Sequence, residues 1–227
     1  MTKDYGKVYA KVYDKSIENI NELIDNLNNY YPNALTTSLD FKNPFELLIS
    51  TILAAQSTDK LVNKVTPALF KKYRSPVEFA SASIEELQED IKSTGFYKNK
   101  SISIIRCSID IIEKFNGKVP DTVEELIQLH GVGRKTANVV AANAFGKPGI
   151  VVDTHMLRIA NLTGLTVSKN ADKVEFDLQK IIPVDKWTNF SHKIVEHGRT
   201  ICIARRPKCE ICPINEFCRY YNDLACS

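Results

Sequence analysis

Apolar residues recur at helical spacing along most of the chain. Between residues 17 and 27 they stand at positions 17, 20, 23, 24 and 27, which is one face of an α-helix with about 3.6 residues per turn. The same spacing predicts further helices over residues 44–55, 62–73, 84–91 and 100–115. No stretch alternates between apolar and polar residues as a half-buried strand does. The pattern therefore predicts an all-α protein.

Short polar segments with glycine or proline separate these predicted helices, as at Gly95, 117–120 and 146–149. Asn43 stands where it can cap the helix that begins at the next residue. The segment DTVE at 121–124 is typical of a capping box that opens a short helix over residues 122–129. The first fifteen residues hold four lysines and three tyrosines and are expected to form an additional arm.

Composition limits the class of protein. Of the 227 residues, 44% are hydrophobic and 25% are charged, which is ordinary for a globular protein, and the net charge of +3 is too small to indicate a nucleic-acid partner by itself. The charged start has no apolar core of a signal peptide, and the longest apolar run, at residues 47–55, is too short to cross a bilayer. We therefore expect a cytoplasmic protein with reduced cysteines and no membrane partner.

The segment LHGVGRKTA at residues 129–137 joins two predicted helices, of which the second extends to about residue 145. Gly131 and Gly133 let the backbone turn sharply, and N–H groups at the start of the second helix can donate to a phosphate oxygen. This spacing is typical of a helix–hairpin–helix that grips the DNA backbone, although an ordinary turn between helices fits it equally. A nucleotide-binding P-loop does not fit, because a helix precedes the glycines and Arg134 separates Gly133 from Lys135.

Two residues are candidates for chemistry. Lys135 lies in the first turn of the second helix, where the helix dipole and any burial favour the neutral amine, a nucleophile that can form a Schiff base. Asp153 follows the apolar run at 150–152, and its carboxylate could stabilise positive charge or take a proton from the lysine. Taken singly, each has a simpler explanation: a solvated lysine, and an aspartate that caps a helix.

Four of the six cysteines are close together in the sequence. The spacing Cys-x6-Cys-x2-Cys-x5-Cys places four thiols within seventeen residues, at Cys202, Cys209, Cys212 and Cys218. Such a set suits a [4Fe–4S] cluster or structural zinc, and the presence of a single Cys-x2-Cys pair favours iron–sulfur. Cys107 lies among isoleucines and is expected in the core, whereas Cys226 is expected to be a free thiol.

A basic segment accompanies these cysteines. The cations of residues 191–208 are Lys193, Arg199, Arg205, Arg206 and Lys208, against one acid, so the local charge is +4. A loop that a metal centre holds at both ends can present such cations to phosphates, although a solvated loop is the alternative. His192 and His197 match no protease zinc motif and are expected to be structural or surface groups.

In combination, residues 129–140, residues 152–158 and the cysteine spacing closely resemble the endonuclease III family of helix–hairpin–helix DNA glycosylases. The resemblance covers nearly the whole chain from about residue 17. The lysine of GVGRKTA, the aspartate eighteen residues later and the four cysteines form a highly specific set. The resemblance implies that Lys135 and Asp153 are the catalytic pair and that the four cysteines hold a [4Fe–4S] cluster.

The resemblance also implies two helical domains with a DNA groove between them. Residues 37–147 would form a six-helix domain containing the helix–hairpin–helix at about 122–145. Residues 148–227 would form the cluster domain, with residues 1–36 packed against it. The implied partner is damaged double-stranded DNA, bound by a monomer that is associated with the nucleoid in a prokaryote.

In the implied reaction, a damaged pyrimidine, expected to be an oxidised one, leaves the duplex, Lys135 attacks C1′ and expels the base, and β-elimination then cuts the strand. Asp153 activates the lysine and stabilises charge on the sugar. Gln56 and Phe96, in the loops at 55–59 and 95–97, are expected to fill the gap in the duplex, and the alternative is that they are ordinary loop or core residues. The other residues expected at the DNA are Gly131, Gly133, Arg134, Thr136, Arg205, Arg206 and Lys208.

Two residues depart from the family pattern. His130 stands where the family usually has proline, which leaves the turn less pre-set, and Ala54 replaces a serine near the base pocket.

Two other functions fit part of the sequence. An adenine-mismatch glycosylase of the same superfamily would lack Lys135 and carry a further domain, and a non-catalytic DNA clamp would need neither Lys135 nor Asp153. The presence of both residues favours a bifunctional glycosylase and abasic-site lyase.

Overall fold

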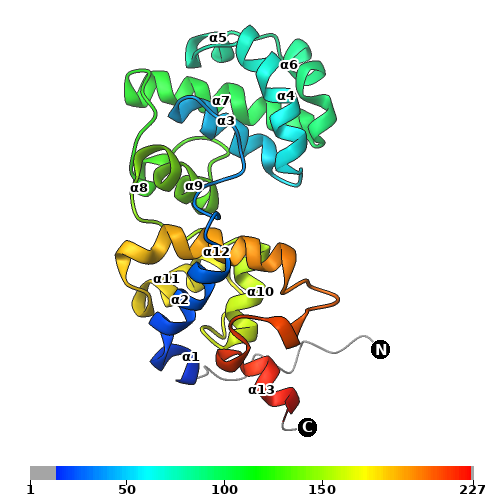
Figure 1. Ribbon diagram of the computed structural model, residues 1–227. Coiled ribbons are helices and arrows are strands. Elements are labelled where there is room, and N and C mark those ends of the chain that lie inside the picture. The colour runs from blue at the N-terminus through cyan, green and yellow to red at the C-terminus, as the bar shows by residue number, and fades with distance from the viewer. Residues whose placement is uncertain (1–13, 226–227) are drawn as a thin grey trace. The chain divides into compact units, whose positions relative to one another are not determined.

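The computed structural model describes residues 14–225, and these residues form helices and loops without any β-strand (Figure 1). The all-α prediction is therefore confirmed. Most of the predicted N-terminal arm, and Cys226, lie outside the described residues. The chain divides into two compact units: the continuous unit, Thr37–Lys147, and the split unit, which joins the residues up to Thr36 to those from Pro148 onward. None of the described helices combines the length and apolar character needed to cross a membrane.

The continuous unit is built around one long helix. Its elements are α3 (Pro44–Ala54), α4 (Asp59–Lys72), α5 (Pro76–Ala80), α6 (Ile84–Ile91), the 3-10 helix η2 (Lys92–Thr94), α7 (Tyr97–Phe115), α8 (Val123–Leu126) and α9 (Arg134–Phe145). Helix α7 packs against α3, α5 and α6, and α9 packs against α3 and α8. Ile104, Cys107 and Ile111 of α7 are fully buried, as the apolar spacing predicts, and Cys107 is a core residue as expected.

The split unit assembles helices from two distant parts of the sequence. They are α1 (Asp14–Glu18), α2 (Ile20–Tyr30), α10 (Thr154–Thr163), α11 (Ala171–Ile181), η3 (Val184–Lys186), α12 (Trp187–Thr200), η4 (Cys209–Ile211), η5 (Asn215–Phe217) and α13 (Arg219–Ala225). Helix α12 packs against α2 and α10. Leu23 and Leu27 of α2 share one core with Met156 and Ile194, so the first helices are an integral part of this unit.

Two local predictions need correction. The helix predicted over residues 17–27 is broken at Asn19, which leaves helical geometry and separates α1 from α2, while the apolar face continues across the break. The cap of α8 is Thr122 rather than Asp121: the hydroxyl of Thr122 accepts from the Glu125 amide at 3.3 Å and donates to the Glu125 carboxylate at 2.8 Å. The cap of α3 is Asn43, as predicted.

Candidate functional site

The segment between α8 and α9 requires glycine at position 131. Gly131 has a φ of +77°, and a Cβ atom there would lie 2.7 Å from the Cβ of Ser103 on α7. Both the backbone conformation and the close approach therefore exclude a larger residue. Gly133 differs, because its backbone is extended and a Cβ atom there would meet nothing within 4 Å. Space beside Gly133 is thus open to a group from outside the unit.

The helix that follows Gly133 has an unusual start. Helices α3, α4, α5, α6 and α8 each begin with a side chain that accepts from the first turn, whereas α7 and α9 have no such side-chain cap. Arg134, Lys135 and Thr136 form the first turn of α9, and Lys135 is exposed to solvent. The amides of this turn lack the capping side chain that α3, α4, α5, α6 and α8 have, and they can donate to an anion.

His130 gives the turn a contact that proline could not. Its backbone N–H donates to Oδ2 of Asp110 on α7 at 2.8 Å, and Lys114 lies 2.6 Å from the other carboxylate oxygen. Burial alone would raise the pKa of Asp110, but the Lys114 ammonium and the His130 amide outweigh it and lower the pKa. Histidine at position 130 fixes the backbone of this turn less than proline would, and a charge-assisted hydrogen bond to Asp110 holds the turn instead.

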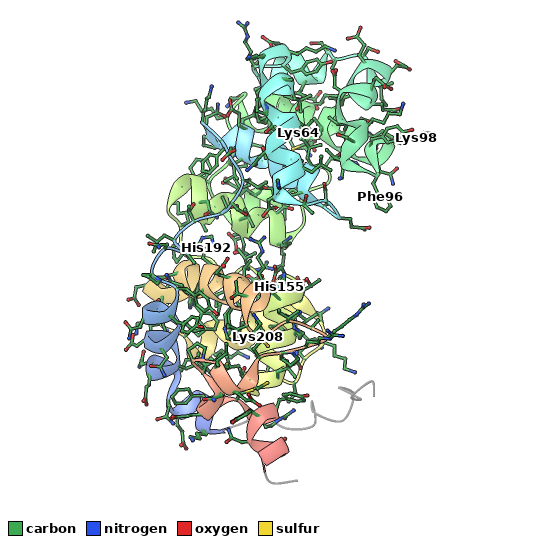
Figure 2. The ribbon with its side chains drawn as sticks, turned by 45° about the vertical axis from the view of Figure 1, so that its right-hand side comes forward. Lys64, Phe96, Lys98, His155, His192 and Lys208 are labelled. Carbon is green, nitrogen blue, oxygen red and sulfur yellow. The ribbon has the colours of Figure 1, made fainter. Side chains whose placement is uncertain are left out.

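Gln56 and Phe96 share a rare backbone conformation. Among described residues other than glycine, a positive φ occurs at Gln56 (55°), Phe96 (50°) and Asn116 (52°). Such left-handed geometry costs roughly 1–2 kcal/mol at a residue with a Cβ atom. Both side chains are exposed, Phe96 to 61%, and Figure 2 shows Phe96 at the surface of the continuous unit. Strain of this kind concentrates at functional positions, which fits the roles expected for these two residues.

Asp153 is the N-cap of α10, and its side chain accepts from the Met156 amide at 2.8 Å. Asp153 therefore caps a helix, which is the simpler of the two explanations that the sequence allowed for it. One carboxylate oxygen caps the helix, and the half-buried side chain retains a second oxygen for chemistry. Lys135 belongs to the continuous unit and Asp153 to the split unit.

Helix α10 is tied to the first cysteine of the cluster segment. The Arg158 guanidinium donates from Nη2 to the carbonyl oxygens of Gly198, at 3.3 Å, and Cys202, at 2.5 Å. His155 packs on Gly198 so closely that a Cβ atom there would lie 2.4 Å from Nδ1 of the imidazole. The position of Asp153 at the start of α10 is thereby coupled to α12 and to the segment that begins at Cys202.

The four predicted ligand cysteines line one pocket of the split unit, together with apolar side chains that include Ile159, Leu162 and Ile214. Burial, together with the neighbouring thiols, raises the pKa of Cys212 to about 12 and that of Cys218 to about 12. Four thiolates this close repel one another unless a cationic centre lies among them. The donor set therefore fits a metal centre.

The arrangement of these thiols fits a cluster better than a single ion. In the described part of the chain, no three His, Cys, Asp or Glu side chains converge closely enough to hold one metal ion. The four cysteines instead surround a pocket, as the ligands of a [4Fe–4S] cluster do, because each thiolate binds a different iron. The residues present thus fit the cofactor expected from the sequence.

His197 connects the pocket to the N-terminal helices. It is 1% exposed, its Nε2 lies 3.5 Å from Sγ of Cys212, and its Nδ1 lies 2.9 Å from the hydroxyl of Tyr31. Burial and the Arg158 charge lower the pKa of His197 to about 4, so the ring is neutral at pH 7. With the hydrogen on Nε2, His197 would donate to Cys212 if that sulfur is a ligating thiolate, and Nδ1 would accept from Tyr31.

The basic segment is only partly as predicted. Arg205, Arg206 and Lys208 are exposed on the loop between the first two cysteines and form no ion pair with any described acidic residue. Lys193 was counted with them by sequence, but it is 2% exposed and its ammonium donates to the carbonyl oxygen of Tyr31. Lys193 therefore joins the two segments of the split unit and is not available to DNA.

Sequence reasoning missed Lys100, Asp110 and His197 as residues that position the site. Lys100 gave one usable signal, since it stands on the same helical face as the buried Ile104 and Cys107. The contact of Asp110 with His130 spans 20 positions, and the contact of His197 with Tyr31 spans 166. No local pattern indicates pairs of that separation.

Comparison with known families gives two matches. A family model described as HhH-GPD superfamily base excision DNA repair protein matches residues 49–184. A second, described as the iron–sulfur binding domain of endonuclease III, matches residues 202–218, so it begins and ends at predicted ligand cysteines.

Individual proteins are similar over most of the chain. Endonuclease III of Synechocystis is 47% identical over 198 residues, which are 87% of this chain and 90% of that protein. Endonuclease III of Escherichia coli K12 is 42% identical over 193 residues, or 85% and 90% of the two chains. A solved structure of a trapped endonuclease III–DNA covalent intermediate, an estranged-adenine complex, is 42% identical with a TM-score of 0.86, covering 92% of this chain and 98% of that one.

Proposed function

Because this chain belongs to the endonuclease III family of the HhH-GPD superfamily, we propose that Lys135 and Asp153 carry out its reaction. The protein is a bifunctional DNA glycosylase and abasic-site lyase of base excision repair, it acts on DNA, and it carries a [4Fe–4S] cluster. One observation carries the assignment of the lysine: it is exposed in the first turn of a helix without a side-chain cap, directly after the glycine hairpin.

Lys135 is the nucleophile of the proposed mechanism. The Nζ lone pair attacks C1′ of the damaged nucleotide, and the bond from C1′ to the base breaks with its electron pair going to the base, which takes up a proton. Opening of the sugar then gives an imine between Nζ and C1′. The imine acidifies the C2′ hydrogen, and loss of that proton breaks the bond between C3′ and its oxygen, which cuts the strand on the 3′ side.

Asp153 assists the first step. Its carboxylate takes the proton that the lysine must lose and stabilises the positive charge that develops on the sugar ring. The hydrogen bond to the Met156 amide at 2.8 Å fixes the carboxylate at the helix start, so its orientation is set before DNA binds. Its role as a cap thus supports its role in catalysis.

The DNA contacts follow from the exposed groups of each unit. The open space at Gly133 and the first turn of α9, with Arg134 and Thr136, receive a backbone phosphate, while Gly131 permits the turn. Gln56 and Phe96 fill the gap that the extruded nucleotide leaves. Arg205, Arg206 and Lys208 neutralise further phosphates without reading bases.

Cys202, Cys209, Cys212 and Cys218 are the proposed cluster ligands. When bound, the cluster supplies the positive charge that keeps four neighbouring thiolates deprotonated and ties the segment 202–218 to α12. Its role here is structural, because the segment contains only the short helices η4 and η5. We further propose damaged pyrimidines as substrates, and a monomer at the nucleoid as the working form, since every proposed functional group comes from one chain.

Borohydride trapping tests the proposal. The wild-type protein, mixed with a duplex that contains an oxidised pyrimidine, should give a covalent complex after reduction, because an imine is reducible. Lys135→Gln should bind the duplex but give no trapped complex and no strand cleavage.

Lys98 offers a matched control, because it occupies the same second position of α7, which is the other α-helix of the continuous unit that begins without a side-chain cap. Lys98→Gln should trap as the wild type does. Trapping by Lys135→Gln would show that another amine reacts. A wild-type protein that releases bases without any trapped complex would instead indicate a monofunctional glycosylase, and one that only binds would indicate a DNA clamp.

A further inference from the structure

Helix α7 carries a buried cation at its start. Lys100 is 5% exposed and stands on the face that continues through Ile104 and Cys107 into the core. Burial lowers the pKa of this lysine. A buried ammonium group is unfavourable unless its hydrogens meet acceptors, so the structure must hold acceptors for it in place.

Two backbone carbonyls from separate segments accept from this lysine. Nζ of Lys100 lies 2.8 Å from the carbonyl oxygen of Leu53 and 2.8 Å from that of Thr94. Leu53 belongs to the last turn of α3, and Thr94 is the last residue of η2. The last carbonyls of a helix have no hydrogen-bond partner within the helix, so the ammonium group satisfies carbonyls at two buried helix ends at once.

The residues that follow these two carbonyls are the strained ones. Gln56 comes three residues after Leu53, and Phe96 comes two after Thr94, and both adopt left-handed backbone geometry with exposed side chains. Such conformations persist only where the surrounding structure holds the backbone on either side. Lys100 hydrogen-bonds to both segments two or three residues before the strained residue and thereby links them.

We propose that Lys100 is a positioning residue that sets the separation of the Gln56 and Phe96 loops, so that both side chains enter the duplex together when the nucleotide is extruded. This rests on the proposed function, in which these two side chains fill the gap. Lys100 touches neither the DNA nor the reacting atoms. It acts on the step that opens the duplex, and the attack by Lys135 proceeds without it.

The experiment compares two substrates in single-turnover reactions of the iron-loaded, full-length protein. One is a damaged pyrimidine in a duplex, which must be extruded and its gap filled. The other is an abasic site in single-stranded DNA, which has no gap to fill. Lys100→Met keeps the length of the side chain and removes its donors. We expect base release from the duplex to fall about 10- to 100-fold, the size of effect that a misplacement of about 1 Å produces. Cleavage of the single-stranded site should change less than about threefold.

A fluorescent base analogue placed opposite the lesion reports the opening directly. Its fluorescence should rise when the wild type or Ile111→Val binds, and it should rise much less with Lys100→Met. Ile111 is the matched control because it is fully buried on the same helix and contacts neither carbonyl through a hydrogen bond. If Lys100→Met folds poorly, Lys100→Gln retains one donor group and should give an intermediate ratio between the two substrates.

The outcomes separate the two proposals. An equal loss on both substrates, or an unchanged ratio in Lys100→Met and Lys100→Gln, would show that Lys100 only stabilises the fold and would overturn its positioning role. The same loss of ratio in Ile111→Val would overturn it as well. Failure of the wild type itself to form a borohydride-trapped complex would count against the proposed function, independently of Lys100.

Discussion

The two units hold their exposed loops by different means. In the continuous unit, α7 fixes the loops around it through its own side chains: Lys100 holds two backbone carbonyls and Asp110 holds the amide of His130. In the split unit, residues 202–218 contain only the short helices η4 and η5, and four thiols surround a pocket. One unit stores its loop geometry in hydrogen bonds of the polypeptide, and the other requires a cofactor.

This difference has a consequence for how substitutions act. A hydrogen bond removed from α7 should loosen one loop and leave the rest of the continuous unit folded, since Ile104, Cys107 and Ile111 still pack in its core. A ligand removed from the pocket should release the whole segment at once, because the binding energy of a structural metal centre is part of the folding energy.

The largest expected effect concerns Asp153, the proposed catalytic group of the split unit. Asp153→Asn should lower single-turnover base release by about two to four orders of magnitude, because a positioned proton acceptor and a fixed negative charge are both lost. Asparagine caps helices as well as aspartate does, so the melting temperature should hardly change. Base release near the wild-type rate would reduce Asp153 to a helix cap.

Asp153→Ala separates the two roles. Alanine cannot accept from the Met156 amide, so this variant should lose about 1 kcal/mol of stability in addition to its activity. The difference in stability between the asparagine and alanine variants measures the cap alone, and their shared loss of base release measures the charge.

The next effect concerns the cofactor. Cys212→Ser should lose iron from a content of about four per chain in the wild type, with loss of the absorbance near ~400 nm, since each thiolate binds one iron of the cluster. The segment 202–218 should then become sensitive to limited proteolysis. Cys107→Ala is the matched control, because Cys107 is buried in the continuous unit. This variant should keep its full iron content. A Cys212→Ser protein that lacks iron but resists proteolysis would contradict the structural role.

A smaller effect is expected from the loop between the first two cysteines. Replacing Arg205, Arg206 and Lys208 together with alanine should flatten the slope of log K against log salt by about 2–3 units, at roughly 0.9 per lost phosphate contact. The loss should be similar on damaged and undamaged duplexes, because phosphate contacts do not read bases. Iron content must match the wild type. An unchanged slope in such a protein would mean that the loop is merely solvated.

The sequence predicted features that depend on neighbours along the chain. Helical spacing placed α6 at its observed bounds, and the cap at Asn43 is a contact over three residues. The break at Asn19 was missed because the apolar face of α1 and α2 continues across it. Periodicity reports which face is buried, and a single residue that leaves helical geometry hardly changes it.

The burial of Lys193 could not be predicted from the pattern along the chain. Lys193 appeared to be part of a basic surface because five of the six charges in its segment are positive, yet it is buried. Its acceptor is the carbonyl of Tyr31, which is 162 residues away. Whether a lysine is buried depends on whether the fold brings a hydrogen-bond acceptor to its ammonium group. Every residue has a backbone carbonyl, so no residue type marks the acceptor in the sequence. The strained backbone at Gln56 and Phe96 could not be predicted either, because the segments before these residues are held by backbone carbonyls that no residue type marks.

The smallest effect should come from the hydrogen bond at the glycine hairpin. Asp110→Ala removes the acceptor of the His130 amide, which lies 2.8 Å from the carboxylate. A hydrogen bond of this kind contributes about 1 kcal/mol, so DNA affinity should fall about fivefold on damaged and undamaged duplexes alike. The pKa of Asp110 lies below its ordinary value of 3.8, so the carboxylate is charged at neutral pH and remains charged in mild acid. The contact with the His130 amide should therefore persist across neutral pH and be lost only when the pH falls below that lowered pKa.

His130→Pro makes this prediction sharp, because proline fixes the backbone of the turn and removes the N–H that Asp110 accepts. In the His130→Pro background, Asp110→Ala should therefore change DNA affinity less than about twofold, whereas it costs about fivefold beside His130. Binding constants for the four proteins of this cycle, measured at one salt concentration, give the coupling between the two positions. Equal losses in both backgrounds would show that Asp110 acts through Lys114 or through the charge of the surface. A coupling of the expected size would show that a side chain on α7 does here what a proline ring does in the family pattern, and that the hairpin, unlike the cysteine segment, is set by the polypeptide alone.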